Sequence, residues 1–73
     1  MASPWRHLGQ RVRALRRARG MTQRALAESA ELSVVYIQKL EAGDRTPSLP
    51  TLDRLAHVLG ARLIVRLTRR RRS

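Results

Sequence analysis

The stretch that decides the fold runs from residue 22 to residue 43 and reads TQRALAESAELSVVYIQKLEAG. Two segments in it begin with a hydroxyl residue, Thr22 or Ser33, which can cap a helix by accepting a hydrogen bond from a free backbone N–H. Gly43 suits the left-handed position that ends a helix. The stretch therefore predicts two short helices joined by a tight connection, each with its own start signal.

The apolar residues of this stretch recur at helical spacing. Ala25, Leu26 and Ala30 form the apolar stripe of the first helix, and Ile37 and Leu40 form that of the second. Two amphipathic helices joined in this way form a helix-turn-helix, whose second helix enters the major groove of DNA. The pattern therefore predicts a DNA-binding unit.

The charge of the chain agrees with this prediction. The 73 residues include sixteen Lys and Arg, fifteen of them arginines, against five Asp and Glu, for a net charge of +11. Four of the arginines lie at positions 69–72, and the rest of the chain is still basic without them. A basic body favours a polyanionic partner, of which nucleic acid is the commonest. A GC-rich genome, which favours arginine codons, is an alternative explanation for part of the excess of arginine.

Other classes of protein are disfavoured. The chain has no cysteine, which excludes disulfides and cysteine zinc sites. It has no apolar run long enough to span a membrane and no signal-peptide pattern, so we expect a cytoplasmic protein without a membrane partner. His7 and His57 have no clustered ligands near them in sequence, and no catalytic constellation is visible. We therefore expect no metal, no cofactor and no enzymatic activity.

The flanking segments predict two more helices. The first starts at Pro4 and stops before Gly20, with Trp5, Leu8, Val12 and Leu15 on its apolar face and Gly9 as a weakening residue inside it. The last begins at the cap Ser48 and ends at Gly60. The expected fold is all-α, with four helices.

The segment from Arg62 to Leu67 changes period and predicts a short β-strand. A lone strand leaves its backbone groups unpaired, so we expect it to pair antiparallel with the same strand of a second copy in a homodimer. A fifth helix over residues 61–67 is the alternative. The expected domain covers residues 1–67, and residues 68–73 form an arginine tail that we expect to be disordered. The expected dimer interface consists of Leu63, Ile64, Val65 and Leu67.

Over about residues 7–60 the chain resembles the Cro/repressor (XRE) family of helix-turn-helix proteins, and its closing strand resembles that of HipB-type antitoxins. The residues that carry the first resemblance are caps, core positions and glycines in register. They are Thr22-Gln23, Leu26-Ala27, Ser33, Ile37, Leu40-Glu41, Gly43, Pro47-Ser48, Leu52, Leu55-Ala56 and Leu59-Gly60.

This resemblance implies roles for individual residues. Gln23 matches a glutamine that bonds a DNA phosphate and supports the recognition helix, and Arg16 with Glu41 matches an ion pair between the first and third helices. Val34 and Val35 depart from the polar residues common in relatives, which implies contacts with thymine methyl groups or readout of DNA shape. For Val34, partial burial in the core is the alternative. The expected DNA-binding residues are Thr22, Gln23, Ser33, Val34, Val35, Tyr36, Lys39 and Arg45.

The leading functional hypothesis is a sequence-specific transcriptional repressor that binds an inverted-repeat operator in double-stranded DNA as a homodimer. One alternative is an antitoxin that also neutralises a cognate toxin protein. Another is a protein that compacts nucleic acid without sequence preference, as the arginine content would allow.

Overall fold

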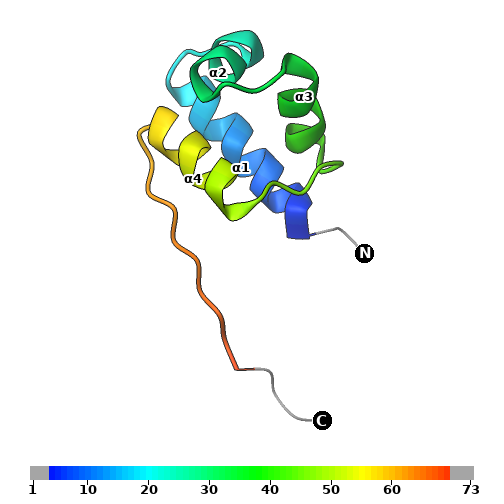
Figure 1. The fold of residues 1–73 in the computed structure, drawn as a ribbon, viewed down its shortest axis with the longest axis vertical. Helices are drawn as coiled ribbons and strands as arrows, with labels where there is room; N and C mark the ends of the chain where they lie inside the picture. The colour runs from blue at the N-terminus through cyan, green and yellow to red at the C-terminus, as the bar shows by residue number, and fades with distance from the viewer. Residues whose placement is uncertain (1–3, 70–73) are drawn as a thin grey trace.

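A computed structural model describes residues 4–69, and from Arg6 onward it describes their side chains. It contains four helices in this range (Figure 1). The helices are α1 (Pro4–Ala18), α2 (Gln23–Ala30), α3 (Val34–Ala42) and α4 (Leu49–Val58). α3 packs against both α1 and α2, and α2 also packs against α4. The expected all-α architecture with four helices is confirmed.

Hydroxyl side chains start three of the helices, as the sequence predicted. Thr22, Ser33 and Ser48 each accept a hydrogen bond from the backbone N–H three residues later, at 3.0, 3.0 and 3.2 Å. All three residues have extended backbone angles, which direct the chain into the first turn. These bonds satisfy N–H groups that have no partner within the helix, and so they fix where each helix begins.

The core forms where the apolar stripes of the helices meet. Four leucine and isoleucine side chains are completely buried there, two from the stripe of α3 and one each from α2 and α4. Val12 of α1 is also buried, and the small residues of α2 let the helices approach closely. The buried hydrophobic residues are Val12, Leu26, Ala27, Ala30, Ile37, Leu40, Leu55 and Leu59.

At Gly9 the backbone of α1 lies very close to the backbone of α3. A Cβ atom built on Gly9 would overlap the main-chain carbonyl oxygen of Leu40 and would lie 2.9 Å from that of Glu41. Backbone atoms cannot rotate away as a side chain can, so only glycine fits at this crossing. The glycine that looks like a weakness of the first helix is a packing requirement of the fold.

The connection between α2 and α3 has an unusual residue. Glu31 adopts a left-handed conformation with φ of 59°, although it has a side chain. Its backbone N–H and that of Leu32 return to the end of α2, and Leu32 donates to the Ala27 carbonyl at 2.8 Å. From α4, Arg54 Nη1 donates to the Ala30 carbonyl at 3.1 Å. The tight turn is thus held by hydrogen bonds from two parts of the chain.

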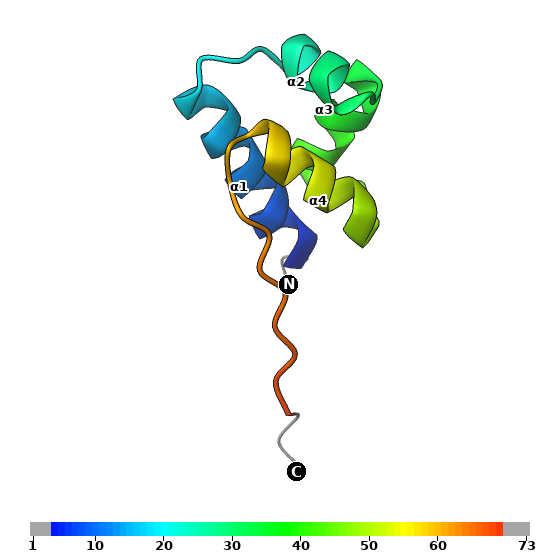
Figure 2. The same cartoon turned by 60° about the vertical axis from the view of Figure 1, so that its left-hand side comes forward.

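The expected strand from Arg62 to Leu67 is wrong for the single chain, and so is the alternative of a fifth helix. Residues 61–69 have no regular secondary structure. Residues 64–69, here called the C-terminal arm, run away from the helices in both views (Figures 1 and 2). Alternating side chains favour a strand only where a partner accepts the backbone bonds, and residues 4–69 supply none.

The expected interface residues on this segment differ in exposure. Leu63 is half-buried, whereas Ile64, Val65 and Leu67 are 76%, 56% and 95% exposed. The predicted disordered tail falls mostly on residues 70–73, which lie outside the described residues. No helix within residues 4–69 combines the length and the apolarity that crossing a membrane requires.

Candidate nucleic-acid interface

The start and outer face of α3 carry most of the side chains that the sequence placed in a DNA-binding set. Ser33, Val35 and Lys39 are exposed, and Val35 keeps 56% of its surface accessible although it is aliphatic. The inner face of the same helix is occupied by Ile37 and Leu40, which are completely buried. The core therefore fixes which face of α3 is presented to a partner.

Val34 and Tyr36 have a different position from Val35. Both are half-buried and pack against the core cluster. For Val34 this packing matches the alternative left open by the sequence, in which its side chain belongs partly to the core. Val34 is the first residue of α3 and directly follows the capping residue Ser33.

Tyr36 and Arg45 form a pair that spacing in the sequence does not indicate. The guanidinium carbon of Arg45 lies 5.1 Å from the centre of the Tyr36 ring, within the range of a cation–π interaction. Arg45 lies on the loop after α3 and is exposed. The ring therefore provides a surface against which the exposed cationic side chain of Arg45 rests, beside α3.

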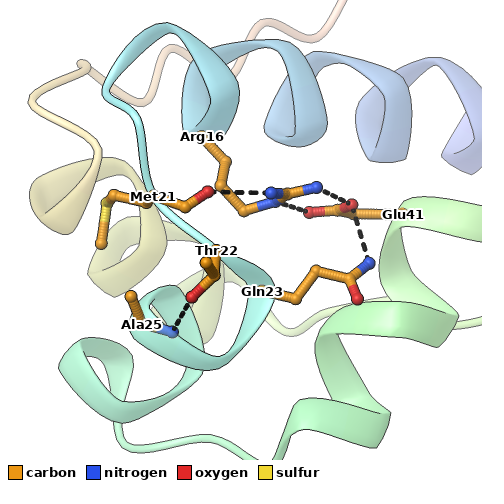
Figure 3. Close-up of polar contacts among 6 residues, drawn as sticks. All are labelled: Arg16, Met21, Thr22, Gln23, Ala25 and Glu41. Carbon is orange, nitrogen blue, oxygen red and sulfur yellow. Dashed lines mark hydrogen bonds and ion pairs between the residues drawn. The ribbon is translucent and has the colours of Figure 1, made fainter.

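Behind this surface, Arg16 and Glu41 form an ion pair in which two hydrogen bonds join the guanidinium to the carboxylate (Figure 3). Arg16 Nε lies 2.7 Å from Glu41 Oε2, and Arg16 Nη2 lies 3.0 Å from Glu41 Oε1. Both side chains are more than nine-tenths buried. Arg16 Nη1 also donates to the Met21 carbonyl at 2.9 Å. One guanidinium thus ties α1 to the end of α3 and to the chain entering α2.

Gln23 joins the same network. Its Nε2 donates to Glu41 Oε1 at 3.2 Å, while the neighbouring Thr22 hydroxyl caps α2 (Figure 3). The side-chain amide is half-buried and has one face toward the ion pair. The structure therefore brings Gln23 together with Arg16 and Glu41, which the sequence had treated as separate features.

The network changes the ionisation of both charged groups. Burial raises the pKa of the Glu41 carboxyl, but hydrogen bonds from Arg16 and Gln23 more than offset this, so its pKa lies below the ordinary value. The hydrogen bond to Glu41 raises the pKa of the Arg16 guanidinium. Glu41 is near the end of α3, where a carboxylate opposes the helix dipole, and the cationic partner compensates for this.

The chemistry that this surface offers is binding. Its exposed groups are hydroxyls, cations and an aliphatic side chain, and the ion pair behind them is fully engaged. Among residues 4–69, no three His, Asp or Glu side chains come together as a metal site would require. Arg54, which bonds the turn between the helices, had no signal in the sequence, because the free carbonyl of Ala30 is visible only in the fold.

The family description of HTH_3, a helix-turn-helix family, matches residues 12–64. The chain belongs to the helix-turn-helix family. Among curated relatives, it is 45% identical over 53 residues to the immunity repressor protein of Bacillus phage phi105, a match that covers 73% of this chain and 37% of the repressor. It is 37% identical over 51 residues to the HTH-type transcriptional regulator YazB of Bacillus subtilis, covering 70% and 74% of the two chains.

The fold also matches that of solved structures. The clp gene regulator ClgR from C. glutamicum matches with a TM-score of 0.83 and 34% identity, covering 85% of this chain and 80% of ClgR. The restriction-modification controller protein C.AhdI from Aeromonas hydrophila matches with a TM-score of 0.76 and 37% identity, covering 78% and 86%. By contrast, the match spans only about two fifths of the length of the first curated relatives.

Proposed function

We propose that this helix-turn-helix protein is a transcriptional repressor that binds an inverted-repeat operator in double-stranded DNA as a homodimer. The observation that carries the proposal is the outer face of α3, where exposed Val35 and Lys39 stand on a helix whose inner face is locked into the core. Occupation of a promoter by the dimer would block transcription. This role is supported by relatives that are named as a repressor and as a transcriptional regulator.

In this proposal, phosphate contacts supply affinity and α3 supplies sequence recognition. Thr22, Gln23 and the N-terminus of α2 face one phosphate, because free N–H groups and the helix dipole attract anions there. Arg45 and Tyr36 contact the backbone on the other side of α3. Ser33, Val34, Val35 and Lys39 face the bases, where the two valines favour thymine methyl groups.

The dimer part of the proposal rests on exposed apolar residues beside the helices. Ile64, Val65 and Leu67 of the arm are exposed apolar residues, and with half-buried Leu63 they are available for self-association. A two-fold dimer would present two copies of α3 to one face of the duplex, with half-sites about one helical turn apart. The alternative of an antitoxin rested on the predicted strand, and residues 4–69 contain no strand.

Selection of bound sites from a random pool of duplex DNA tests the proposal. We expect a palindromic motif with a fixed spacing between its halves. In a titration with salt, log K should fall against log salt with a slope of roughly −5 to −9, if about 6–10 phosphates are neutralised. Recovery of unselected sequences with a steep slope would indicate compaction without sequence preference. A slope near zero would refute DNA binding itself.

A further inference from the structure

An apolar groove opens between α1 and α4. Its volume is about 240 Å³, and its wall is completed by residues 61–63 just before the arm. Leu8 and Leu15 line it from α1, and Leu52 and Leu59 line it from α4. None of the residues in the proposed DNA-binding set lines this groove. The groove is therefore an apolar surface that the proposed function leaves unused.

The same chain also carries an unpartnered apolar segment next to the groove. The arm begins where the wall of the groove ends, and Val65 and Leu67 are 56% and 95% exposed. At about 3.3 Å per residue, an extended arm of six residues reaches roughly 20 Å. At about 1.5 Å per residue, the ten residues of α4 span roughly 15 Å. An extended arm is thus long enough to follow the whole groove.

The arm does not suit the groove of its own chain. It leaves the groove at Leu63 and continues away from the helices (Figure 2). Folding back would require a reversal directly after Leu63, but residues 64–69 contain no Gly, Pro, Asn or Asp, the residues that favour tight turns. The arm of another copy has the same length and apolar side chains, and it can enter the groove without a reversal after Leu63.

We propose that the groove between α1 and α4 receives the C-terminal arm of a second copy of this chain, and that the exchange is reciprocal. Alternation along an extended arm places Val65 and Leu67 toward the groove and Arg66 toward solvent. A two-fold axis then covers both grooves and both arms at once. This inference rests on the dimer in the proposed function and names the surface that forms it.

Charge gives the exchange a distinctive salt dependence. Arg11 and Arg62 border the groove, and a docked arm adds Arg66, on its solvent side, and Arg69 to the same surface. Like charges oppose the association, and added salt screens them. Dimerisation should therefore strengthen as salt rises, whereas the proposed DNA binding weakens over the same range. The two properties can be separated by this opposite response.

Disulfide cross-linking tests the exchange without DNA, because the natural chain has no cysteine. Arg11→Cys in one chain and Val65→Cys in another introduce single thiols at exposed positions of the groove and the arm. The full-length variants are mixed at micromolar concentration and oxidised. The matched control replaces the groove variant with Arg24→Cys, at an exposed position of α2 that does not line the groove.

We expect the Arg11–Val65 pairing to form cross-linked heterodimers at least about tenfold faster than the control, because thiols within one complex react at millimolar effective concentration. Sedimentation of the unmodified protein should show the dimer fraction rising with salt. Equal rates in both mixtures would overturn the proposal, as would self-linking of Val65→Cys alone. In a variant that carries both Arg11→Cys and Val65→Cys in one chain, an intramolecular disulfide would instead show that the groove binds the arm of its own chain. If the cross-linking occurs as expected but the protein binds DNA without sequence preference, only the proposed function is refuted.

Discussion

Gln23 and Glu41 are joined by a hydrogen bond of 3.2 Å from the side-chain amide to a carboxylate oxygen, and that oxygen also receives Arg16 Nη2 at 3.0 Å. The first residue of α2 is thereby tied to the last turn of α3 and, through Arg16, to α1. This arrangement links the orientation of Gln23 to the same ion pair that holds α3. Changes to the pair should therefore affect both stability and DNA affinity.

Removing one partner of the ion pair should be more damaging than removing both. Arg16→Met or Glu41→Leu alone leaves a buried charge without compensation and should lower the free energy of unfolding by about 3–5 kcal/mol. The double variant should lose less than the sum of the two single variants. Urea denaturation of the four proteins measures the coupling. Additive losses would show that the two side chains do not interact in solution.

Stability should fall on acidification, with a contribution from Glu41. Its pKa is lowered below the ordinary value of 4.5, so the folded protein binds a proton there less readily than the unfolded chain does. The stability from this group is complete above the ordinary value and is lost as the pH falls through the folded value. Urea midpoints between pH 6 and pH 3 should therefore change more steeply for the natural protein than for Glu41→Gln. Parallel curves would contradict this role.

Substitutions on the outer face of α3 should change sequence preference. Val35→Ala and Lys39→Ala should each alter the selected site, since one base contact contributes about 1–3 kcal/mol of discrimination. Arg45→Ala should weaken binding to all sequences alike, because phosphate contacts carry no sequence information directly. Gln38→Ala, also exposed on α3, is the control that should leave the motif unchanged. If neither helix variant alters the motif, another face of the protein contacts the bases.

The aromatic ring of Tyr36 should support Arg45 in binding DNA. Arg45→Ala should weaken binding equally in the natural protein and in Tyr36→Phe, which keeps the ring. In Tyr36→Leu, which lacks the ring, Arg45→Ala should cost about 0.5–1 kcal/mol less binding free energy than in the natural protein. This difference is the usual range of an exposed cation–π pair. Fluorescence anisotropy with a labelled duplex measures the four affinities in each cycle. Equal losses in all backgrounds would show that the ring does not position the arginine.

Gly9→Ala should destabilise the protein, although alanine is the better helix former. Helix propensity alone predicts a gain of about 0.5–1 kcal/mol. The overlap with the Leu40 carbonyl instead predicts a loss at or above the usual 1–3 kcal/mol of overpacking, because two helix backbones must separate. Gln10→Ala, exposed on the same helix, is the control and should change stability little. Thermal unfolding of both variants distinguishes the two predictions, and a stabilised Gly9→Ala would disprove the close crossing.

Local patterns were sufficient wherever the decisive interaction is short in range. A hydroxyl cap bonds a backbone group three residues away, and an apolar stripe repeats within one helix, so Thr22, Ser33 and Ser48 could be assigned from sequence spacing. The prediction of a strand after Gly60 was wrong for the opposite reason. Its alternating side chains satisfy the local pattern of a strand, but a strand needs a partner that no local pattern supplies.

The sequence by itself determined that this protein is a small basic helix-turn-helix chain, because caps, glycines and apolar spacing act within a few residues of one another. Only the tertiary structure decided that Gly9 is required at a helix crossing, that Gln23 belongs to the Arg16–Glu41 network, and that Tyr36 lies under Arg45. These contacts depend on how rigid helices cross and on where loops return, and so they join residues whose spacing carries no signal.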